Sequence, residues 1–140
     1  MRTKLCLLLL WSGVVMVAVG LWSPLVWLPV IYDIRYTDMT YLGGTGDAIM
    51  IVALMAAASV MQVSTRHQLR SIAWFCAGGA VALVAGTMWD ICRWASDKVQ
   101  DLGGEALLAQ LQYRKGTLLV GLGMTLWLLG SVRQMLREQK

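Results

Sequence analysis

The chain has 140 residues, of which 58% are hydrophobic and 14% are charged, and its net charge is +4. This length suits a single domain. The apolar excess over ordinary globular composition excludes a typical soluble domain.

Charged residues and histidine are absent from four runs of 28, 18, 19 and 17 residues, namely 5–32, 48–65, 71–89 and 116–132. A helix needs about 20 residues to cross a bilayer core, and a charge at its centre costs roughly 2.5–3.5 kcal/mol. We therefore predict one domain over 1–140, an all-α four-helix transmembrane bundle. Its spans lie at about 5–23, 48–65, 71–89 and 116–132, with outer segments 24–47 and 90–115.

The first run follows Arg2 and Lys4, as the apolar region of a secretory signal peptide would. The apolar sequence continues to Val30, well past the small residues Ala18-Val19-Gly20 that could serve for cleavage. This continuation favours an uncleaved first span.

The distribution of charge over the loops predicts the orientation. Seven cations and one acid fall at the two termini and in the connection 66–70, which sums to +6. Five cations and seven acids fall in the other two loops, which sums to −2, and the two sums give the net +4. We therefore expect a protein of the bacterial inner membrane with both termini in the cytoplasm. Because topology and the lipid bilayer account for the basic excess, we predict no nucleic-acid partner.

The segment after the first span carries Pro24 and Pro29, which disrupt helices, together with aromatic residues typical of a membrane interface. Alternation over 31–42 then predicts either a short β-hairpin in this first outer loop or an irregular surface loop. Asp47 lies where the second span opens, and its charge suits a helix N-terminus.

The residues after Trp89 continue a helical pattern, because Asp90, Arg93, Trp94, Asp97 and Asp101 recur at spacings of three and four. Gly103-Gly104 ends that pattern, and strong helix formers resume at Glu105. We predict helices over 71–101 and 105–136, whose ends form a helical hairpin outside the membrane, one continuing the third span and one leading into the fourth.

The sequence contains no recognisable motif for metal binding, cofactor binding or catalysis. His67 is the single histidine, so bis-histidine haem ligation is excluded and zinc lacks a ligand group. We expect no cofactor, no metal, no catalytic residue and no enzyme activity. Cys92 is alone on the outer side, where it is either a small apolar residue or a link between two copies; its redox state stays open.

Small residues recur within the spans at spacings that allow close helix packing. They serve either packing inside one chain or association of identical chains. The helix-packing candidates are Gly78, Ala82, Gly86, Gly116, Gly123 and Gly130.

Aromatic residues beside charges on the outer side are typical of protein contacts. The predicted partner-binding set is Tyr36, Tyr41, Trp89, Asp90, Arg93, Trp94, Asp97 and Asp101. The leading hypothesis is a non-catalytic membrane protein that binds another membrane or extracytoplasmic protein. It would act as an accessory subunit of a membrane complex or as an immunity-type protein against a membrane-acting toxin. The alternative is a homo-oligomeric pore or small-solute carrier.

Over its whole length the chain resembles the small four-span inner-membrane proteins of bacteria. The resemblance rests on four spans in 140 residues, on Gly46-Asp47 opening the second span and on Gly130-Ser131 closing the last. The layout is also similar to claudin-type proteins, with Gly20-Leu-Trp22 near the first outer loop. That loop is too short and lacks the paired cysteines of claudins. Neither resemblance implies an activity or a site residue.

Overall fold

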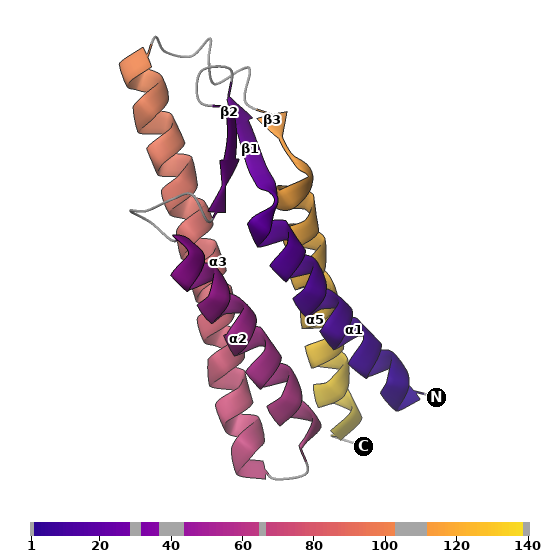
Figure 1. Cartoon of the computed structure of the whole chain (residues 1–140). Helices are drawn as coiled ribbons and strands as arrows, with labels where there is room; N and C mark the ends of the chain where they lie inside the picture. Colours follow the sequence, from indigo (N-terminus) through magenta and orange to yellow (C-terminus); the bar gives the residue numbers. More distant parts are fainter. Residues whose placement is uncertain (1, 29–31, 37–43, 65–66, 103–111, 139–140) are drawn as a thin grey trace.

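The computed structural model describes residues 2–28, 32–36, 44–64, 67–102 and 112–138 as four helices and a small sheet (Figure 1). The helices are α1 (Arg2–Trp22), α2 (Gly44–Val63), α3 (His67–Leu102) and α5 (Lys115–Glu138), and the strands are β1 (Pro24–Leu28), β2 (Tyr32–Arg35) and β3 (Gln112–Tyr113). The strands lie at one end of the bundle, called the sheet end below. α1 begins and α5 ends at the opposite end, called the terminal end.

All four helices are long and apolar enough to cross a membrane, as expected of a multi-pass membrane protein. The candidate spans are Lys4–Trp22, Gly44–Val63, Gln68–Trp94 and Lys115–Leu136. The helix predicted over 71–101 is confirmed as α3, with the ends shifted by a few residues. α3 starts at His67, so most of the stretch 66–70 that was expected to be a connection is helical.

The helices associate as two pairs, α1 with α5 and α2 with α3, and α1 also packs against α2 (Figure 1). In the first pair the backbones touch. A Cβ atom added to Gly123 would lie 2.8 Å from the Val17 nitrogen and 2.9 Å from the Gly13 oxygen. A side chain at Gly123 would therefore force the two helices apart. Glycine lets the two helices approach until dispersion contacts between backbones hold them.

The sheet is antiparallel with strand order β2-β1-β3, and it corrects the position of the predicted hairpin. The hairpin was predicted over 31–42, whereas the structure pairs Trp27 with Asp33 and Leu28 with Tyr32; residues 37–42 lie outside the described residues. Pro24 was expected to mark a disrupted interfacial segment. It is the first residue of β1, a strand position where proline is tolerated because its missing amide is not needed there.

A second correction concerns the helix predicted over 105–136. Gln112 and Tyr113 form β3, which pairs with Trp27 and Val26 of β1, and α5 begins only at Lys115. Strand β1 has backbone groups to satisfy on its second edge, and this pairing overrides the local helix preference. The predicted helical hairpin therefore has α3 as its single extended arm among the described residues; residues 103–111 lie outside them.

The junction between the sheet and α5 is held by the carbonyl oxygen of Leu25. That oxygen accepts hydrogen bonds from the Arg114 backbone nitrogen at 2.9 Å and from the Thr117 hydroxyl at 2.6 Å. The Arg114 guanidinium also lies over the Trp27 ring, 5.6 Å from its centroid, a cation–π arrangement. The strands therefore continue the α1–α5 pair beyond the bundle.

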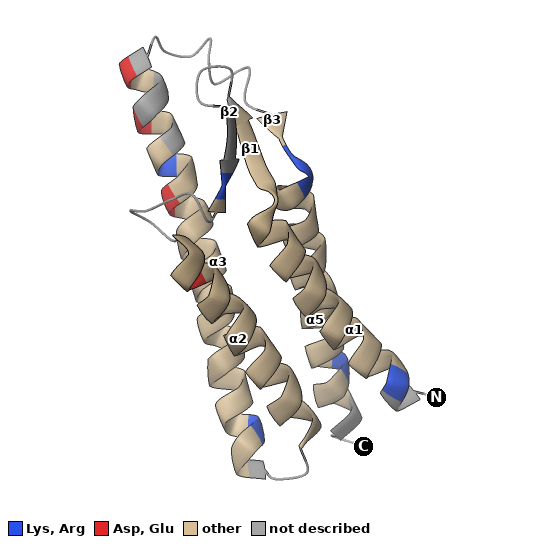
Figure 2. Cartoon of the chain, viewed as in Figure 1, with Lys and Arg blue, Asp and Glu red and all other residues tan. Residues whose placement is uncertain are grey.

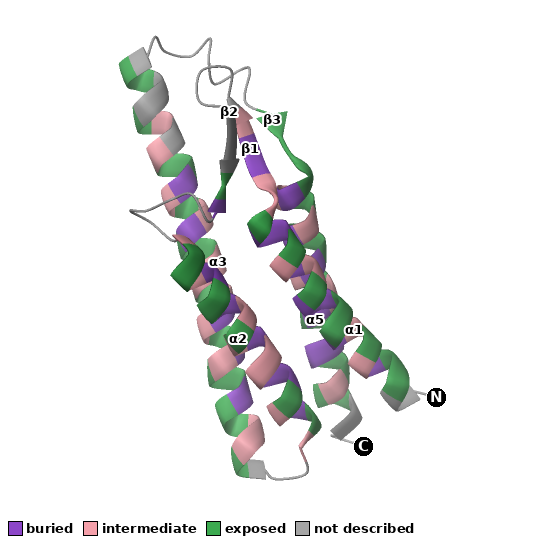
Figure 3. Cartoon of the chain, viewed as in Figure 1, coloured by how far each residue is buried: buried purple, intermediate pink, exposed green. Residues whose placement is uncertain are grey.

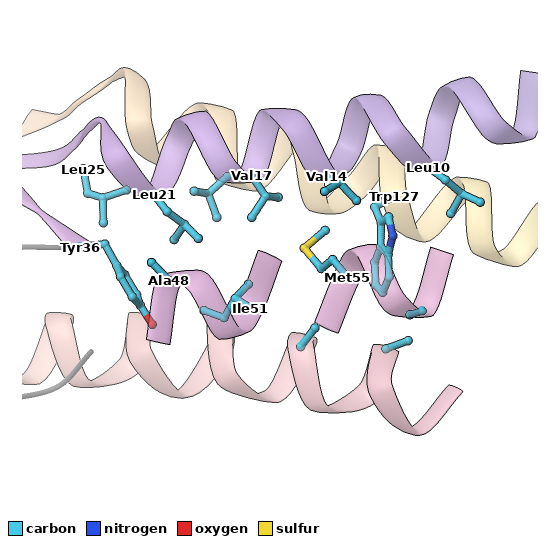
Figure 4. Close-up of a cluster of buried hydrophobic side chains, with 14 of the residues drawn as sticks. Leu10, Val14, Val17, Leu21, Leu25, Tyr36, Ala48, Ile51, Met55 and Trp127 are labelled. Carbon is cyan, nitrogen blue, oxygen red and sulfur yellow. The ribbon is translucent and has the colours of Figure 1, made fainter. Parts of the chain in front are cut away.

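The buried core runs along the axis between the two helix pairs (Figures 3 and 4). Leu10, Val17 and Leu21 of α1 face Ile51 and Met55 of α2 across it. The α3 residues that face α2 are small: Ala73, Ala77 and Ala80 are all buried. These alanines let α3 lie close to α2. The side of α3 that faces away from α2 lies outside the core.

Candidate functional site

The sheet end of α3 has one face turned to the bundle and one face turned away from it. Thr87 and Ile91 are buried, whereas Trp89 is 72% exposed. The residues that follow the candidate span, 95–102, extend the helix by about 12 Å at 1.5 Å per residue. In Figure 1 this part of α3 stands apart from the other helices. It is a helical arm with a free aromatic residue at its base.

Charged residues follow the exposed face of this arm (Figure 2). Arg93, Asp97 and Asp101 are exposed, and Asp90 is half-buried. Arg93 and Asp97 are four positions apart, so their side chains are neighbours on the helix surface. At the terminal end the described charges are mainly basic and include Lys4, Arg70 and Arg133. The described charges at the sheet end are of both signs, with Asp47, Asp90, Asp97 and Asp101 beside Arg35, Arg93, Arg114 and Lys115.

Trp94 and Tyr36 of the predicted partner-binding set do not lie free on this face. Trp94 is half-buried, and a further member, Tyr41, lies outside the described residues. Tyr36 is 1% exposed, and its hydroxyl donates a 2.9 Å hydrogen bond to the hydroxyl oxygen of Thr87. Thr87 in turn donates to the Leu83 carbonyl at 2.7 Å. Tyr36 therefore connects the residues after β2 to α3 and is a packing residue.

Burial raises the pKa of Tyr36, the hydrogen bond with Thr87 opposes that rise, and the charge of Asp47 adds to it. We therefore expect stability to fall as pH rises above about 10, where unfolded tyrosine loses its proton and folded Tyr36 keeps it. The folded state then binds more protons than the unfolded state, so the free energy of unfolding decreases by up to about 1.4 kcal/mol per pH unit.

This pH dependence is measurable as the thermal midpoint in detergent between pH 9 and pH 11. Other tyrosines, lysines and cysteines titrate in the same range, so the quantity of interest is the difference between the wild type and Tyr36→Phe. The variant should show a shallower fall. Equal slopes for the two proteins would show that Tyr36 is not responsible.

The six helix-packing candidates divide into two groups. Gly116, Gly123 and Gly130 of α5 all contact α1: a Cβ on Gly116 would meet the Pro24 and Gly20 oxygens, and one on Gly130 would meet Leu10. On α3, a Cβ at Gly78 or Gly86 would have nothing within 4 Å, and Ala82 is exposed. The α5 glycines thus lie inside the chain's own packing, and the α3 residues lie on its surface.

Polar contacts inside the bundle were not anticipated from the sequence. Trp127 is fully buried, and its indole nitrogen donates a 2.8 Å hydrogen bond to the Ser59 hydroxyl oxygen, which donates to the Met55 carbonyl at 2.7 Å. Near them, Gln62 and Ser131 are buried at 3% and 1% exposure. Gln62 is the one carboxamide in the four charge-free runs. Its position could have indicated a polar contact inside the bundle, but the sequence prediction considered ionisable side chains alone.

Among the described residues, no group of three or more histidine, cysteine, aspartate or glutamate side chains could hold a metal ion. The three cysteines are free, with Cys6 buried, Cys76 half-buried and Cys92 exposed. Cys92 is therefore accessible on α3, just before the arm. No protein-family model, curated protein or solved structure matches this chain.

Proposed function

We propose that this chain is a non-catalytic integral membrane protein that binds a protein partner through the exposed face of the α3 arm. Trp89, Arg93, Asp97 and Asp101 would form the contact surface, which we call the arm face. The protein would serve as an accessory subunit of a membrane complex or as an immunity-type protein against a membrane-acting toxin. The bundle would anchor the arm in a bacterial inner membrane, with both termini in the cytoplasm.

The observation that carries this proposal is the position of Trp89. Its side chain is 72% exposed at the base of a helix that continues past its candidate span, next to the exposed Arg93. Tryptophan and arginine are the residues most enriched where truncation weakens protein contacts. A membrane anchor alone would need the tryptophan but not eight further residues of charged helix, so the arm supports recognition better than anchoring.

The test is native mass spectrometry of the protein extracted gently from its own membranes at natural abundance. We expect a second polypeptide at fixed stoichiometry, and we expect it to be lost from the double variant Trp89→Ala/Arg93→Ala. Both side chains are exposed, so their truncation should change the free energy of unfolding by no more than about 0.5 kcal/mol.

Trp74→Ala is the matched control, because Trp74 is a 40% exposed tryptophan on the same helix within the candidate span. Loss of the partner from the arm variant but not from this control would support the arm face. A partner retained by the arm variant would rule that face out while leaving another docking surface.

A homo-oligomeric pore or small-solute carrier is the second candidate, and the open face of α3 favours it. Gly78 and Gly86 have free space where a side chain would be, and Ala82 between them is exposed. Such a ladder allows two membrane helices to approach closely. In the same measurement this function would appear as a ring of identical chains that Gly86→Leu dissociates without destabilising the single chain.

A further inference from the structure

We propose that Gln62 of α2 and Ser131 of α5 form an interior binding site for water at the terminal end of the bundle. Both side-chain atoms of the Gln62 carboxamide and the Ser131 hydroxyl are buried without a hydrogen-bond partner among the described residues. The core cluster around them is mostly hydrophobic, and neither lipid tails nor hydrophobic side chains can bond to these groups. Buried polar groups in native proteins are otherwise nearly always paired.

The two side chains lie at the same level of the bundle. α2 and α5 both run from the sheet end to the terminal end, and they are joined by the 2.8 Å bond from Trp127 to Ser59. Ser131 follows Trp127 by four positions, and Gln62 follows Ser59 by three. At 1.5 Å per residue, Gln62 lies about 4.5 Å and Ser131 about 6 Å beyond that bond, each on nearly the same face of its helix. From this bond and the helix periodicity we infer that Gln62 and Ser131 face each other between α2 and α5.

The chemistry of the pair suits water. A carboxamide offers two N–H donors and one carbonyl acceptor, and a hydroxyl both donates and accepts. A water molecule makes two to four hydrogen bonds to such groups in protein interiors. No charge lies among the four groups of the cluster, Ser59, Gln62, Trp127 and Ser131, so an ion finds no counter-charge there. Gln62 is the penultimate residue of α2, which brings the site near the aqueous phase at the terminal end.

The site can be observed directly by NMR of protein labelled with 15N-glutamine in lipid nanodiscs. The Gln62 carboxamide signal is assigned by its loss in Gln62→Leu. We expect magnetisation transfer, by a rotating-frame Overhauser effect, from water protons to the protons of this carboxamide. Its sign is opposite to that of a signal from hydrogen exchange, so the two are distinguished. We expect the transfer to weaken severalfold in Ser131→Ala, because the water loses one of its ligands.

A double-mutant cycle with Gln62→Leu and Ser131→Ala gives an independent readout. With water bridging the two groups, each single substitution should lower the ratio of folded to unfolded protein by roughly 3- to 10-fold. The double variant should lose less than the product of the two. Ser12→Ala is the matched control, because the exposed hydroxyl of Ser12 bonds to the Leu9 carbonyl of its own helix. This variant should show no coupling to Gln62.

Three results would overturn the proposal. Stabilisation by both single substitutions, adding independently and without water transfer, would mean that the polar groups are unpaired. Coupling without water transfer would mean that Gln62 bonds directly to Ser131. Transfer to Gln62 from lipid protons in place of water would mean that a lipid polar group occupies the site.

Discussion

Gly123→Ala is expected to destabilise the folded protein by about 1–3 kcal/mol, the usual cost of forcing extra volume into a packed interface. The added methyl group would lie 2.8 Å from the backbone nitrogen of Val17 and 2.9 Å from the Gly13 oxygen. Backbone atoms cannot rotate away as a side-chain end can, so α1 and α5 must separate. Since the sheet is attached to both helices, the separation should also loosen the sheet end. The measurement is the thermal midpoint in detergent together with hydrogen exchange of the β1 amides.

Gly121→Ala is the matched control, two positions away on the same helix. Nothing lies within 4 Å of a Cβ at Gly121, and alanine favours helix over glycine by up to about 1 kcal/mol. This variant should be as stable as the wild type or more stable. Equal losses for the two variants would show that α5 is sensitive to any change and would remove the evidence for backbone contact at Gly123.

Trp127→Ala is expected to cost about 3–5 kcal/mol, the range for removing a large buried aromatic side chain. Trp127 is the largest fully buried side chain, and it reaches from α5 toward α2 near Met55 (Figure 4). Its removal leaves a cavity at the place where the α1–α5 pair meets α2, and it leaves the Ser59 hydroxyl oxygen without its donor. The predicted readout is a large fall of the thermal midpoint.

Two companion variants separate volume from hydrogen bonding. Trp127→Phe keeps most of the ring and loses the indole donor, so we expect about 0.5–1.5 kcal/mol. Trp11→Ala removes a tryptophan that is 44% exposed, and it should cost much less than Trp127→Ala. A Trp127→Phe variant as unstable as Trp127→Ala would place the main contribution in the bond to Ser59 and not in packing.

The helices were predictable because a membrane imposes a simple rule. A segment that crosses lipid must satisfy its backbone groups internally, so the length of a charge-free run indicates a helix and its bounds. The spacing of Asp90, Arg93, Asp97 and Asp101 extended this reasoning beyond the span and located the end of α3 correctly. The sequence pattern was sufficient for the helices because their hydrogen bonds join residues that are close in the sequence.

The sheet was not predictable in the same way. β3 has two residues, and nothing in Gln112-Tyr113 distinguishes them from the helix formers around them; the strand exists because β1 offers an unpaired edge. The hairpin was displaced for a related reason. Alternation at 32–36 was recognised, but the partner strand has a continuous apolar sequence after Pro24, which resembles a membrane-interface segment.

The glycine seam carried a signal that could have been used. Gly13 and Gly20 are seven positions apart, as are Gly116 and Gly123, and in antiparallel order Gly13 meets Gly123 while Gly20 lies against Gly116. Matching periods on two helices indicate which of them pair. The ladder of Gly78, Ala82 and Gly86 has a spacing of four with no counterpart, consistent with its position on the open face.

The pairing of the first helix with the last determines when the fold can be completed. Gly13 and Gly123 are 110 positions apart, so α1 enters the membrane long before its partner is synthesised. α2 and α3, separated by three residues, can associate as soon as both are inserted. β3 and α5 emerge together at the end of synthesis and supply the third strand and the glycine face at once. A chain released before α5 is synthesised would therefore leave the face of α1 that carries Gly13 and Gly20 without the backbone contacts that α5 supplies.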